Sequence, residues 1–87
     1  MKYSVLFQEV KKQVDAIDVY GLLAIGSPGD EFDIESEMIT ARLRIGMTPY
    51  SIAEIIAEVM NKQFDKNFGA IDFISYAEKI EKVLNNN

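Results

Sequence analysis

The chain has 87 residues, and its 14 acidic and 9 basic side chains give a net charge of −5 at neutral pH. It contains no histidine, cysteine or tryptophan. Without histidine and cysteine, the chain cannot form a zinc finger, a disulfide scaffold, a thiol nucleophile or a serine-histidine triad.

Size and composition predict a single folded domain over residues 1–87. Hydrophobic residues make up 48% and charged residues 26% of the chain, which is typical of a globular protein and not of a disordered one. No apolar run approaches the roughly 20 residues needed to cross a bilayer, and the N-terminal stretch lacks the pattern of a signal peptide. Together with the lack of cysteine, these features favour the cytoplasm.

The first predicted helix covers residues 3–17. Its apolar residues recur at spacings of three and four, as expected for one face of an amphipathic helix: Tyr3, Leu6, Val10, Val14 and Ile17. The next segment, 18–33, contains Pro28 and three of the five glycines, so we predict an ordered loop there, with at most one short turn of helix. Its apolar residues are expected to close one end of a helical bundle, or alternatively to form a docking surface: Tyr20, Leu22, Leu23, Ile25 and Phe32.

A second helix is predicted from about Asp33, as its N-cap, to Ile45, with Gly46 ending it. The apolar residues of this helix form one stripe beside Ile39 and Leu43: Ile34, Met38, Ala41 and Ile45.

The third helix should begin at a capping box formed by Ser51 and Glu54, just after Pro49, and it should end at Phe68-Gly69. Its apolar face is the broadest in the chain, so we predict that it is the central helix; the face consists of Ile52, Ile55, Ile56, Val59, Met60 and Phe64.

The last helix should be capped by Asp72 and should turn four residues inward, namely Phe73, Ala77, Ile80 and Leu84. The tail from Asn85 to Asn87 is expected to fray. Strands are the competing interpretation of segments such as 52–56, but the sustained period of three to four residues favours helices. The predicted fold is an all-α, compact four-helix domain.

The segment that follows the first predicted helix also carries a recognisable motif. It consists of Asp18, Gly21-Leu22-Leu23, Gly26-Ser27-Pro28, Asp30-Glu31-Phe32-Asp33 and Glu35. This motif resembles that of a small bacterial domain family of unknown function, whose pattern runs approximately D-P-x-G-L-L and then G-A-P-x-D-E-Y-D. The chain departs from the pattern at Val19, Ser27 and Phe32, where the family commonly has proline, alanine and tyrosine.

The resemblance continues beyond the motif. Ser51 with Glu54 matches the family's later helix start, and Phe68-Gly69 matches its late F-G, so the similarity spans residues 15–84. It implies a compact all-helical domain and no assigned activity.

The densest charge feature of the sequence is an acidic cluster, made of Asp30, Glu31, Asp33, Glu35 and Glu37. One interpretation is structural, because acidic residues at a helix N-terminus interact favourably with the helix dipole. A second is a patch that binds a protein, and a third is a cation site, although the spacing does not match an EF-hand loop. The candidate partner-binding residues are Asp18, Asp30, Glu31, Phe32, Asp33 and Glu35, and no metal ion or cofactor is predicted.

An enzyme is not expected, because a chain this short can hardly enclose a substrate pocket and keep a core. Ser27 does not lie in a nucleophile elbow. The acidic balance argues against nucleic acid, so a charged partner should be a basic protein. We therefore predict a non-catalytic protein-interaction module, in a narrower form an immunity or antitoxin protein. The alternatives are a regulator that binds a divalent cation or small ligand, and a structural homo-oligomer.

Overall fold

The computed structural model describes residues 2–18, 26 and 31–86. The helices are α1 (Tyr3–Ile17), α2 (Asp33–Arg42), α3 (Pro49–Phe64) and α4 (Ile74–Asn85), and a 3-10 turn, η1 (Ala70–Phe73), leads directly into α4. The described residues contain four α-helices and no strand, which confirms the predicted all-α four-helix fold. Most of the predicted loop between the first two helices, residues 19–25 and 27–30, lies outside the described residues.

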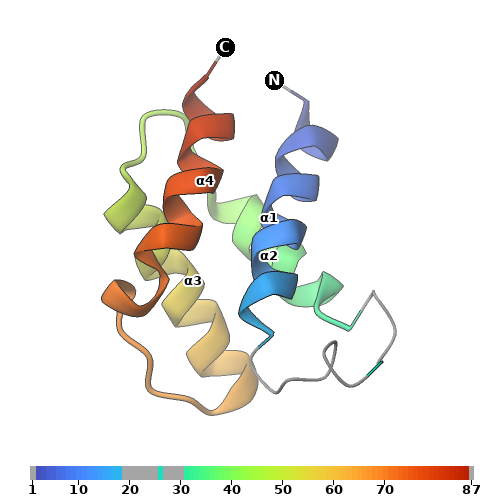
Figure 1. Ribbon diagram of the computed structural model, residues 1–87, viewed down its shortest axis with the longest axis vertical. Coiled ribbons are helices and arrows are strands. Elements are labelled where there is room, and N and C mark those ends of the chain that lie inside the picture. The colour runs from blue at the N-terminus through green and yellow to red at the C-terminus, as the bar shows by residue number, and fades with distance from the viewer. Residues whose placement is uncertain (1, 19–25, 27–30, 87) are drawn as a thin grey trace.

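The four helices pack into one bundle around a shared core, with α1 and α4 in front of α2 and α3 in the view of Figure 1. α1 packs against α2 and α4, and α3 packs against the same two helices, so α1 and α3 occupy opposite corners. α3 supplies more buried side chains than any other helix. It packs against α2, η1 and α4, which agrees with the prediction that the third helix is the central one.

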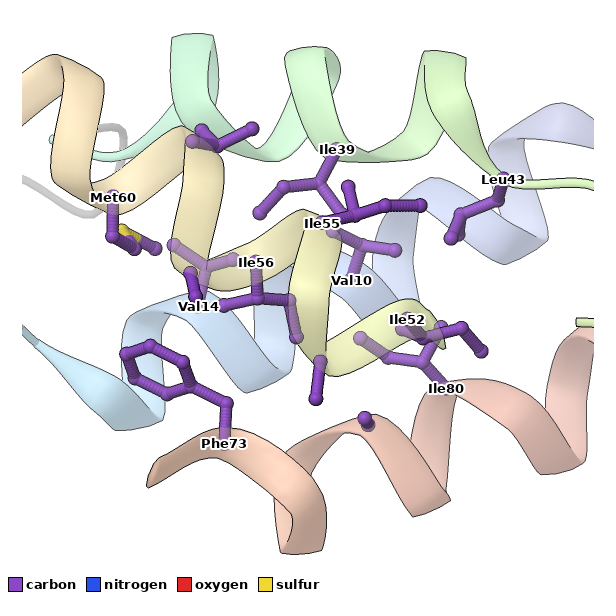
Figure 2. Packing of buried hydrophobic residues seen from close by; sticks show 14 of the residues in the cluster. Val10, Val14, Ile39, Leu43, Ile52, Ile55, Ile56, Met60, Phe73 and Ile80 are labelled. Atoms are coloured by element: carbon purple, nitrogen blue, oxygen red, sulfur yellow. The ribbon is translucent and has the colours of Figure 1, made fainter. Parts of the chain in front are cut away.

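The core is built from the inward faces of all four helices (Figure 2). Val10, Ile39, Ile56 and Ile80 come one from each helix, and each is 0% exposed. The four inward residues predicted for the last helix are all buried, as are five of the six predicted for the third, with Phe64 partly buried. None of the described helices has the length and apolar character needed to span a bilayer.

Three predicted helix caps are corrected by the structure. Asp33 is the first residue of α2 and not its N-cap. The N-cap is Phe32, whose side chain makes no capping hydrogen bond. α3 is capped by Thr48 and not by Ser51: the Thr48 hydroxyl accepts a hydrogen bond from the Ser51 N–H at 3.2 Å, and Pro49 occupies the first turn. Asp72 lies within η1, where its Oδ2 accepts from the Gly69 N–H at 2.9 Å, so helical structure begins before the predicted cap.

The helix ends also differ from those predicted. α2 stops at Arg42, three residues before Ile45, because Leu43 is extended and buried, and the Arg44 guanidinium donates to the carbonyls of Ala41 and Leu43. These two bonds satisfy backbone acceptors that a continuing helix would otherwise use. α3 ends at Phe64, where Asp65 adopts a left-handed conformation with φ of 54°. α1 has the predicted bounds.

Candidate protein-binding surface

The acidic cluster does not form one open patch among the residues that the structure describes. Asp30 lies outside them, and Glu31 is exposed in the turn before α2. Asp33 is bound to α1: its Oδ1 lies 2.6 Å from Lys11 Nζ. Lys11 also lies 3.3 Å from Asp15 Oδ2, one helical turn further along α1. Asp33 therefore joins the first two helices.

The ion pair with Asp33 changes the pKa of Lys11. The pKa of Lys11 is raised, chiefly by its hydrogen bond to Asp33, with a smaller contribution from the hydrogen bond and charge of Asp15. Partial burial of the ammonium group acts in the opposite direction. The protonated lysine is thus held between two carboxylates that connect α1 to the start of α2.

Glu35, the next predicted binding residue, is buried at 6% exposure. Gln63 of α3 donates from its Nε2 to Glu35 Oε2 at 3.2 Å. A carboxylate that is buried and already hydrogen-bonded offers little to a partner. Asp33 therefore binds a residue of α1, whereas Glu35 binds a residue of α3. The two carboxylates do not share a partner.

Phe32 and Asp18 also have structural roles. Phe32 is 1% exposed, and its ring meets the ring of Phe64 edge-on, with centroids 5.8 Å apart. Asp18 is the C-cap of α1 in a left-handed conformation with φ of 44°, and its N–H donates to the Val14 carbonyl at 3.1 Å. Of the predicted site residues that the structure describes, Glu31 alone is classed as exposed.

The periodicity of the sequence groups Ile34, Met38 and Ala41 in one stripe beside Ile39, and the structure shows which side of α2 is buried. The side of α2 that packs against the core contains Ile39 together with three polar residues, Glu35, Ser36 and Thr40. The two hydroxyls are satisfied within the helix: Ser36 Oγ donates to the Phe32 carbonyl at 2.9 Å, and Thr40 Oγ1 donates to the Ser36 carbonyl at 2.6 Å. Polar residues can therefore occupy the core side without an unpaired hydroxyl.

The apolar stripe of α2 is largely exposed, although Met38 packs partly against the core. We call Ile34, Met38 and Ala41 the outer face of α2; Ile34 is 66% exposed, Ala41 is exposed and Met38 is half-buried. Their spacing of four and then three residues places them on one side of the helix. Exposed apolar residues that adjoin a groove favour a binding surface, and Met38 of this stripe lines one.

Such a groove lies between α2 and α3. It has a volume of about 410 Å³ and is lined by Met38, Arg42, Glu58, Val59 and Lys62. Arg42 and Glu58 bridge the two helices at one end, with Nη2 and Oε1 3.0 Å apart. Met38 belongs both to the outer face of α2 and to the groove, so the two features form one continuous surface.

Among the residues that the structure describes, no three acidic side chains are close enough together to hold a metal ion. The cation hypothesis included Asp30, which lies outside those residues, so it stays a prediction.

No protein-family model matches the chain, and neither a curated protein nor a solved structure shows significant similarity to it. The resemblance to a bacterial domain family therefore stays a prediction.

Proposed function

We propose that the chain is a cytoplasmic, non-catalytic protein-interaction domain that binds its partner through the outer face of α2. The observation that carries the proposal is the inverted burial of this helix. Ile34 is 66% exposed, whereas Glu35 and Thr40 of the same helix are 6% and 3% exposed. An exposed isoleucine beside buried polar groups does not stabilise a monomer. A partner that covers Ile34 removes its apolar surface from water, which stabilises the complex.

The exposed apolar surface supplies part of the binding energy. Burying one large aliphatic side chain contributes on the order of 1–2 kcal/mol, and the half-buried Met38 adds apolar area at the groove. The groove also gives the surface a concave shape, into which a protruding side chain of the partner can insert. These features support a small, reversible interface.

The lining of the groove supports a non-catalytic role. Glu58 is its one carboxylate, and that group is already bound to Arg42. General acid-base chemistry by paired carboxylates needs two such groups on either side of a substrate. The sequence also contains no histidine or cysteine that could act as base or nucleophile.

Affinity capture from a native lysate tests the proposal. The tagged chain is compared with an Ile34→Glu variant and with the matched control Ile71→Glu, since Ile71 is an exposed isoleucine on η1, at 83%. We expect a stoichiometric protein to be retained by the wild type and by the Ile71 variant, and lost with the Ile34 variant. Circular dichroism checks that all three are folded. Equal retention by all three would remove the outer face of α2 as the binding surface.

A basic partner, such as the toxin bound by an immunity protein, is the second candidate. It is favoured by the net charge of −5 and by Glu31 and Glu37, which are both exposed and lie on either side of Ile34 in the sequence. Under this hypothesis, Glu31→Gln with Glu37→Gln should weaken capture, and added salt should weaken it further. Capture that is insensitive to both changes would contradict it.

A further inference from the structure

We draw no further inference here: the strongest candidate, the groove between α2 and α3 with the outer face of α2 beside it, belongs to the surface already described, its Arg42 and Glu58 are paired with each other, and nothing in the structure shows what covers it.

Discussion

Asn61 connects the end of α3 to the loop before η1 by pairing its side chain with backbone groups. Its Oδ1 accepts from the Phe68 N–H at 2.7 Å, and its Nδ2 donates to the Phe68 carbonyl at 3.0 Å. The side-chain amide of Asn61 thus supplies both hydrogen-bond partners that the backbone of Phe68 would otherwise find in a helix or a strand. The position of Phe68, whose ring meets the buried Phe73 with centroids 5.1 Å apart, depends on these bonds.

Asn61→Ala should lower the free energy of unfolding by about 1–3 kcal/mol, because two part-buried backbone groups lose their partner. The control is Asn67→Ala, an exposed asparagine in the same loop, which should change stability by less than about 0.5 kcal/mol. Urea denaturation measures the free energy of unfolding of both variants, and its dependence on urea concentration should have the same slope as in the wild type. Similar losses for the two variants would show that the bonds to Phe68 contribute little.

Lys11 gives stability a dependence on alkaline pH. Its pKa is raised above the ordinary value of 10.5, mainly by the hydrogen bond to Asp33. A group with a higher pKa in the folded state stabilises the fold fully below its unfolded pKa, and this stabilisation is lost as the pH rises through the folded pKa.

Lys11→Met should therefore lower the free energy of unfolding by about 0.5–1 kcal/mol at pH 7, since the pair is partly exposed. The difference from the wild type should shrink as the pH rises above 10.5. Lys12→Met, the exposed neighbour, serves as control and should match the wild type at both pH values. A difference from the wild type that does not change with pH would contradict the assignment to this ion pair.

At the scale of elements, α2 shows how packing partners select the buried face of a helix. Apolar residues occur on both of its sides, so either could face a core: Ile34, Met38 and Ala41 on one, Ile39 on the other. The adjoining contacts decide between them. Phe32 packs on Phe64 just before the helix, Leu43 is buried just after it, and Gln63 binds Glu35 between them.

Two alanine substitutions test this orientation. Ile39→Ala should cost about 2–5 kcal/mol, because Ile39 is 0% exposed and its removal leaves a cavity. Ile34→Ala should change stability by less than about 0.5 kcal/mol in dilute protein, because Ile34 is 66% exposed. Thermal or urea unfolding compares the two. The reverse order would show that the Ile34 side of α2, and not the Ile39 side, faces the core.

At the scale of the whole molecule, the end of α4 is joined to the connection between α2 and α3. Asn85 Oδ1 accepts from the Gly46 N–H at 2.7 Å, and its Nδ2 donates to the Met47 carbonyl at 3.0 Å. The prediction that Asn85 frays is wrong, because this residue ends α4 and forms bonds to residues 39 and 38 positions away. Gly46 has a φ of 96°, which suits glycine and turns the chain toward the asparagine.

Asn85→Ala should lower the free energy of unfolding by about 1–2 kcal/mol, because it removes two hydrogen bonds between distant parts of the chain. Asn86→Ala is the matched control, as Asn86 is exposed and follows the helix. Amide hydrogen exchange gives a second measurement: protection of the Gly46 N–H should fall in the first variant and persist in the second. Unchanged protection in both would mean that this bond is not maintained in solution.

The candidate partner-binding residues stay a prediction. They include Glu31, which is exposed in the turn before α2. They also include Asp33, Glu35 and Phe32, whose partners Lys11, Gln63 and Phe64 lie on other helices. Local pattern cannot reveal that an acid is already paired with a residue 22 or 28 positions away.

Local periodicity determined the helical class, the bounds of α1 and the buried residues of α3 and α4, because in each of these helices the apolar residues lie on one side. Only the tertiary structure decided the orientation of α2, since the side with more apolar residues is the more exposed one and the choice depends on what α1 and α3 offer. The hydroxyls of Ser36 and Thr40 permit that choice, because they bond to carbonyls of the preceding turn and can be buried without cost from an unpaired group.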